Sequence, residues 1–212
     1  MRGAGIAGCR RAGASVYFRP VSSLSDDASP AWSRRLREEF GAADRRATAL
    51  AAALSPRQLN WQPRPGAWSI GQCLEHLHVA NEVYLPPIAR ALVGARAAEV
   101  EEISPGWFGR WFIRSHIDPD TQGAPRRAPR KIVPHRDVDP DILSRLLAGN
   151  QKVRDLVQRA AECDVNRVRF RNPFVPVIWF TVGTGFEILA RHQRRHLLQA
   201  ERVRSAPGFP PA

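Results

Sequence analysis

Four long stretches of this sequence repeat apolar residues every three or four positions, which is the period of an amphipathic α-helix. They cover residues 30–54, 70–95, 140–162 and 181–204. In the first stretch the repeat runs through Leu36, Phe40, Ala43, Ala47, Leu50 and Leu54. No segment shows a convincing alternation of apolar and polar residues, which is the period of a half-buried strand. The pattern therefore predicts an all-α chain built from four helices.

Residues near the ends of these stretches support the same boundaries. Ser69 is a suitable N-cap for the second helix, and Pro140 suits the first turn of the third. Ser55-Pro56 ends the first helix. Pro86-Pro87 lies inside the second, where proline removes backbone donors and clashes with the preceding turn, so we expect a kink or a short break there.

The connections predict how the helices are arranged. The second connection, residues 96–138, is long, rich in proline and charge, and carries an aromatic cluster that suggests one short helix. The third, residues 163–179, holds two prolines that argue against a central strand. A long crossover between helices two and three lets them run parallel, which predicts an up-down-down-up four-helix bundle over residues 29–205. We expect residues 1–28 to be a disordered extension and residues 206–212 a frayed tail.

Composition narrows the setting in which the chain works. No run of eighteen or more apolar residues occurs, so no transmembrane helix and no membrane partner are expected. The three cysteines are scattered and show no C-x-x-C spacing, which argues against a disulfide framework and against a thiolate zinc site. A reducing cytoplasm is the simplest location.

The formal net charge of +12 first suggests a nucleic-acid partner. Much of it, however, lies in residues 1–20 and 104–136, and only two of the 32 basic residues are lysine. This looks like a bias of base composition toward arginine codons, so no sequence-specific nucleic-acid binding is expected.

Two histidines, His192 and His196, lie four residues apart in RHQRRHLLQAERV. On a helix they share one face about one turn apart, which suits metal binding but also describes an ordinary polar helix face. A third ligand should come from the inner side of another helix. His76 and His78 in LEHLHVA are candidates that point about 200° apart, and periodicity alone does not decide between them.

Two segments resemble the DinB-like superfamily of bacterial four-helix bundles. The family shows Trp-Ser followed by His-Leu at the start of helix two, and H-x-x-x-H, often followed by Gln, in helix four. Trp68-Ser69 and His76-Leu77 match the first pattern, and His192, His196 and Gln199 match the second. The resemblance spans residues 30–204 and implies that His76, His192 and His196 bind one divalent metal ion (Zn, Ni or Fe) with an open coordination position.

Other side chains near these positions have two interpretations each. Cys73 is either a fourth ligand or a small apolar core residue, and Gln199 either orients a ligand or lies on the surface. His78 is expected on the helix surface or partly buried. His116 and His135 are expected to be exposed loop residues. Glu75 and Glu187 are expected to point away from the three histidines, and Arg191, Arg194 and Arg195 are expected to face solvent. The loop tryptophans Trp107, Trp111 and Trp179 could line a pocket.

The resemblance also implies a range of functions. Characterised relatives include metal-dependent transferases that join thiols such as bacillithiol or mycothiol to electrophiles, and a maleylpyruvate isomerase. We therefore expect a metal-dependent enzyme that transfers a low-molecular-weight thiol to an electrophile or hydrolyses a small substrate. The alternative is a non-catalytic metal-binding bundle acting as a stress-linked binding module. Family members commonly pair, so a homodimer is expected.

Overall fold

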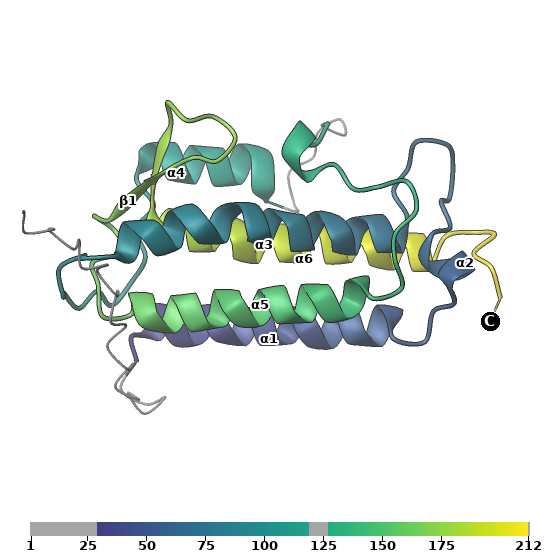
Figure 1. The fold of residues 1–212 in the computed structure, drawn as a ribbon, viewed down its shortest axis with the longest axis horizontal. Helices are drawn as coiled ribbons and strands as arrows, with labels where there is room; N and C mark the ends of the chain where they lie inside the picture. Colours follow the sequence, from purple (N-terminus) through teal and green to yellow (C-terminus); the bar gives the residue numbers. More distant parts are fainter. Residues whose placement is uncertain (1–28, 119–126, 212) are drawn as a thin grey trace, which may run out of the picture.

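The computed structural model describes residues 29–118 and 127–211. Its four long helices are α1 (Ala31–Ala51), α3 (Ile70–Leu92), α5 (Ile142–Ala160) and α6 (Val182–Arg204). Helices α1 and α3 each pack against both α5 and α6. In Figure 1 the chain runs in one direction along α1 and α6 and in the opposite direction along α3 and α5. The predicted up-down-down-up bundle with its crossover is confirmed.

The ends of the helices follow local capping rules. The Ser69 hydroxyl accepts a hydrogen bond from the Gln72 backbone N–H, and the Gln72 side chain accepts one from the Ser69 N–H. Ser55 and Gln58 form the same reciprocal pair at a short helix, α2 (Pro56–Leu59), that the sequence analysis missed. Thr181 caps α6 through the Thr184 N–H.

The proline pair inside α3 does not end the helix. The break expected at Pro86-Pro87 is absent, because α3 is one helix from Ile70 to Leu92. Tyr84 and Ile88, on either side of the pair, are both buried in the core. Packing of these side chains offsets the cost of the lost backbone donors.

The crossover between α3 and α5 is folded against the bundle. It contains α4 (Trp107–Phe112), a π-helix η2 (Ile113–Ile117) and a 3₁₀ turn η3 (Arg130–Ile132). The short helix expected around the aromatic cluster is α4. Because η2 contacts α6 and η3 contacts α3, the crossover covers the side of the bundle formed by these two helices (Figure 1).

A small hairpin joins this cover. Strand β1 (Arg169–Arg171) pairs antiparallel with β2 (Trp179–Thr181), with Phe170 opposite Phe180. No convincing strand was expected here, and the two prolines argued against a central one; Pro173 and Pro176 lie in the loop between the strands and interrupt no pairing. A Cβ atom on Gly185 of α6 would lie 2.8 Å from the Phe170 ring, so glycine permits this close contact.

The carboxyl-terminal residues pack rather than fray. The ring of Phe209 lies edge-on against Trp61, with 5.4 Å between centroids. The backbone carbonyl of Pro210 accepts a hydrogen bond from Gln58 Nε2 at 3.0 Å. These contacts tie the tail to α2. Residues 1–28, predicted to be an extension, lie outside the described part of the chain.

None of the helices in the described ranges has both the length and the apolar character needed to cross a membrane.

A buried polar layer divides the apolar interior into two clusters. Asn150 of α5 donates to Asp44 of α1 at 2.7 Å, and its Oδ1 accepts from Asn81 of α3 at 2.8 Å and Gln193 of α6 at 2.9 Å. One cluster of apolar side chains lies on each side of this layer. The layer therefore links all four helices through one side chain, and it fixes their relative positions along the bundle.

The Asn150→Ala variant should unfold more easily than the wild type. The substitution leaves the buried amides of Asn81 and Gln193 without their acceptor, so we expect a loss of about 2–3 kcal/mol in the free energy of unfolding. Urea denaturation followed by circular dichroism measures this loss. The exposed neighbour Gln151→Ala is the matched control, with an expected change within about 0.5 kcal/mol. Equal stability of the two variants would show that the layer contributes nothing.

Candidate metal centre

The structure brings His76, His192 and His196 together. His76 comes from α3 and the other two from successive turns of α6. The Nε2 atoms of His76 and His192 are 2.9 Å apart, and the three ring centroids are 4.5 to 4.7 Å from one another. When one ring nitrogen is taken from each histidine, all three nitrogens lie within 4.8 Å of one another. The predicted cluster is therefore present as a compact group of donors.

Two partners outside the cluster orient the imidazoles. His76 Nδ1 lies 2.6 Å from the carbonyl oxygen of Ile132. Because a carbonyl only accepts, Nδ1 donates, and the lone pair of His76 is on Nε2, toward His192. His196 Nδ1 lies 2.9 Å from Gln199 Oε1 and donates to it in the same way. Such outer partners fix the tautomer of metal-binding histidines, so Gln199 has the orienting role that was one of its two interpretations.

This donor set fits a divalent cation. In the metal-free chain one of the two facing Nε2 atoms has to donate a proton to the other. A cation accepts both lone pairs at once and takes a third from His196. Neutral imidazole suits zinc, nickel and iron(II), as expected from the sequence. The three histidines could hold such an ion.

The imidazoles are in the neutral, metal-binding form at neutral pH. Burial lowers the pKa of His76 to about 4, and the Arg195 cation adds to this effect. Burial, with His76 and Arg195, lowers the pKa of His196 to about 3. The pKa of His192 is also well below its usual value, first because of burial and then because of the two other histidines. Metal binding at pH 7 therefore needs little displacement of protons.

Trp68 forms part of the support for the cluster. Its ring centroid lies 4.7 Å from that of His76 and 5.6 Å from that of His196. Trp68 precedes the cap of α3, so the capping box at Ser69 also positions this ring. In the Trp-Ser pair of the sequence pattern, Trp68 therefore contacts the rings of His76 and His196, and Ser69 caps the start of α3.

The cluster forms part of the wall of a cavity of about 290 Å³. Helices α3 and α6 form one side, and η2, residues 127–132 and the loop of the hairpin form the other. Apolar side chains dominate the lining, among them Phe112, Phe174 and Ile178. The crossover and the hairpin therefore partly cover the space next to the histidines, where a small molecule would be partly shielded from water.

The other candidate ligands do not join the cluster. Cys73 is fully buried in the apolar core, where burial raises the pKa of its thiol. Of its two interpretations, the structure supports the small apolar core residue. The Glu75 carboxylate accepts two hydrogen bonds from His135 of the crossover, one from Nδ1 at 2.8 Å and one from the backbone N–H at 2.7 Å. Glu187 forms ion pairs with Arg35 and Arg191. Both carboxylates are thus engaged elsewhere.

The remaining histidines divide as follows. His116, in η2, lines the cavity, which corrects the expectation of an exposed loop residue. His135 is bound to Glu75 and does not line the cavity. His78 is half-buried and lies near Gly149 of α5, on a different side of α3 from His76.

One arginine also corrects the sequence analysis. Arg195 was expected to face solvent, but it is half-buried and lines the cavity. Its Nη1 donates to the backbone carbonyl of His116 at 3.1 Å. The η2 segment folds back onto α6 and covers this position, which helical periodicity did not predict. Trp107, Trp111 and Trp179, interpreted from the sequence as loop packing residues that could line a pocket, are at least about half exposed and do not line the cavity.

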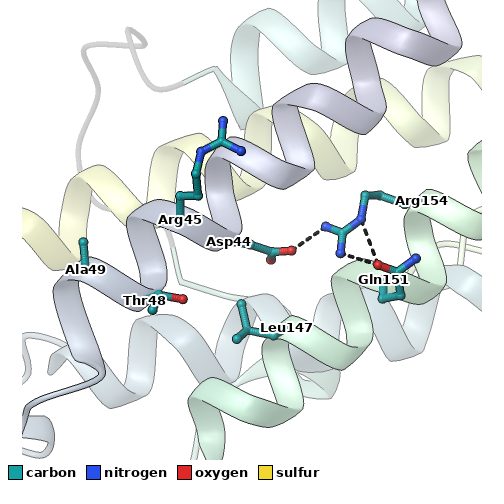
Figure 2. Close-up of a pocket in the computed structure, with 7 residues that line it drawn as sticks. All are labelled: Asp44, Arg45, Thr48, Ala49, Leu147, Gln151 and Arg154. Carbon is teal, nitrogen blue, oxygen red and sulfur yellow. Dashed lines mark hydrogen bonds and ion pairs between the residues drawn. The ribbon is translucent and has the colours of Figure 1, made fainter. Parts of the chain in front are cut away.

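A second hollow lies between α1 and α5, on a different side of the bundle. Figure 2 shows Asp44 facing Arg154, with Arg154 also bonded to Gln151. Asp44 additionally accepts from Asn150 of the polar layer. Asp44 and Arg154 therefore satisfy one another, and no histidine lines this hollow in the described chain. The three clustered histidines line the other cavity, beside α3 and α6.

Comparisons with known proteins agree with this fold. A solved structure of YfiT from Bacillus subtilis, described as a probable metal-dependent hydrolase with an unusual four-helix bundle topology, superimposes with a TM-score of 0.55 at 13% sequence identity. The match covers 91% of this chain and 95% of that one, and it shows the shared fold. No curated protein matches the chain. The sequence pattern of the DinB superfamily matches residues 39–200. This chain belongs to the DinB superfamily.

Proposed function

We propose that the chain is a metal-dependent enzyme that acts on a small molecule in the cavity beside His76, His192 and His196. The observation that carries the proposal is the position of these imidazoles, whose nitrogens converge at the wall of a partly covered, mostly apolar cavity. A structural metal site is usually closed by four protein ligands, whereas three leave a position for substrate. The description of YfiT as a probable metal-dependent hydrolase supports the same class of chemistry.

The reaction we favour is transfer of a low-molecular-weight thiol to an electrophile, with hydrolysis of a small substrate as the second form. A divalent ion held by the histidines supplies Lewis acidity, which lowers the pKa of a thiol or of water. No carboxylate of the described residues lines the cavity as a general base. A thiol that ionises readily needs less help from such a base than water does, and this favours the transfer reaction.

The residues of the chain have separate tasks in this proposal. Ile132 and Gln199 hold the proton on Nδ1 of His76 and of His196, which leaves Nε2 of each ring available. Phe112, Phe174 and Ile178 exclude water from the reacting groups. His116 lies at the cavity wall, where its ring stacks on Phe112, and among the described residues it is the histidine outside the cluster that lines the cavity and could transfer a proton.

Metal-dependent turnover tests the proposal. The protein, purified without a histidine tag and loaded with Zn, Ni or Fe(II), is assayed for conjugation of monochlorobimane with several low-molecular-weight thiols and for hydrolysis of small esters and amides. We expect turnover that stops after chelation, is absent in His192→Ala and persists in His78→Ala. A protein that holds the metal but shows no turnover in either assay would instead be the non-catalytic metal-binding bundle.

A further inference from the structure

The cavity beside the histidines has an unbalanced charge. Two arginines, Arg127 and Arg195, line it, and no aspartate or glutamate among the described residues does so. Histidine side chains add no negative charge to this lining. Arg127 is exposed, whereas Arg195 is half-buried against the mostly apolar lining, where an unpaired cation is more costly than in water. The cavity is therefore suited to a ligand that carries negative charge.

Arg195 is positioned to pair with the negative charge of such a ligand. Its bond to the His116 carbonyl anchors the guanidinium at the cavity wall through Nη1 alone. No Asp or Glu of the described ranges lies within ion-pair distance of it. Arg191, one turn earlier on α6, is paired with both Asp118 and Glu187. A guanidinium has five N–H donors in a planar fork that matches a carboxylate, and most of those on Arg195 remain for a ligand.

The rest of the cavity recognises an apolar group. Phe112 and Phe174 lie in the lining with Tyr84 and Ile178, and the four side chains come from α4, α3 and the hairpin loop. A volume of about 290 Å³ is at the small end of the range for ligand sites, so one aromatic ring with a short chain is a suitable size.

We propose that the ligand of this cavity is a small carboxylate with an apolar body, and that Arg195 binds the carboxylate while the aromatic side chains contact the body. The inference rests on the proposed function in one respect, since it takes this cavity as the substrate site. It adds the class of the substrate and a residue that selects it. Arg195 acts here by binding and orienting.

A pair of matched ligands tests the proposal. Binding of 3-phenylpropionate and of its neutral amide is measured by titration calorimetry on the metal-loaded protein. We expect the acid to bind about tenfold to a hundredfold more tightly than the amide, as a charged hydrogen-bonded pair predicts. Arg195→Gln should bind the two ligands about equally, and Arg195→Lys should keep part of the preference. The control is Arg194→Gln, an exposed neighbour on the same helix, which should behave as the wild type.

The outcomes separate this inference from the proposed function. Three results would each show that Arg195 does not select the charged ligand. They are equal binding of acid and amide by the wild type, no measurable binding of either, and an undiminished preference for the acid in Arg195→Gln. Metal content is measured separately, and the titrations are repeated after chelation. A chain that holds metal without an Arg195-dependent preference overturns the inference alone. A chain without metal that keeps the preference supports the inference and overturns the proposed function.

Discussion

The His192→Ala variant should lose the bound metal, whereas the wild type should carry about one divalent ion per chain. His192 Nε2 lies 2.9 Å from His76 Nε2, at the point where the lone pairs meet, so its removal takes away one of three donors. Two imidazoles alone do not complete a protein zinc site. Elemental analysis of protein purified without a histidine tag measures the stoichiometry, and the His76→Ala variant should give the same result.

A graded series makes the test specific. Gln199→Ala removes only the acceptor of His196 Nδ1–H, so its metal affinity should fall about 10–100-fold rather than vanish. His78→Ala is the matched control on α3, because His78 lies outside the cavity, and it should keep the metal. Circular dichroism of each variant excludes unfolding as the cause of any loss. Metal retained at full stoichiometry in both His76→Ala and His192→Ala would show that the cluster is not the binding site.

The helices could be predicted because their signals are local. The apolar repeat and the cap at Ser69 gave the start of α3 at Ile70, and the repeat of α6 ended at Arg204, as in the structure. A helix period and a capping residue depend on neighbours within one or two turns. The crossover topology followed from the length of one connection. None of these signals needed knowledge of distant contacts.

The candidate site could be predicted only in part. The spacing of His192 and His196 places them on one helix face whatever the fold, but the choice of His76 over His78 came from the resemblance to a family. The structure shows the physical reason for the difference between them: His76 faces α6, whereas His78 lies against Gly149 of α5. That difference depends on how α3 is rotated within the bundle, and Leu74 and Leu77, both fully buried, help to set the rotation.

The cover of the cavity could not be predicted. It is made of η2, residues 127–132 and the hairpin loop, which have no long apolar repeat and reach the site through contacts distant in sequence. The positions of Arg195 and His116 depend on this cover, as the bond between them shows. Arg195 was expected on the solvent side of α6 by default, and the segment folded over that side makes it a cavity residue.

The Phe186→Ala variant should lose about 3–5 kcal/mol in the free energy of unfolding. Phe186 is fully buried in α6, and its ring stacks on Trp32 of α1 with 6.3 Å between centroids. The substitution removes apolar contacts and leaves a cavity that the rigid helices around it fill only partly. Urea denaturation of the metal-free protein measures the loss without a contribution from bound metal.

A control with a similar side chain identifies burial as the cause. Trp107 is 76% exposed, so Trp107→Ala removes a larger ring and should change the stability by no more than about 0.5 kcal/mol. Phe186 does not line the cavity, so the folded Phe186→Ala protein should still bind one metal ion. A loss below about 1 kcal/mol would mean that α1 and α6 are not packed through this ring. Loss of metal from the folded variant would instead mean that the core packing of α6 sets the position of His192 and His196.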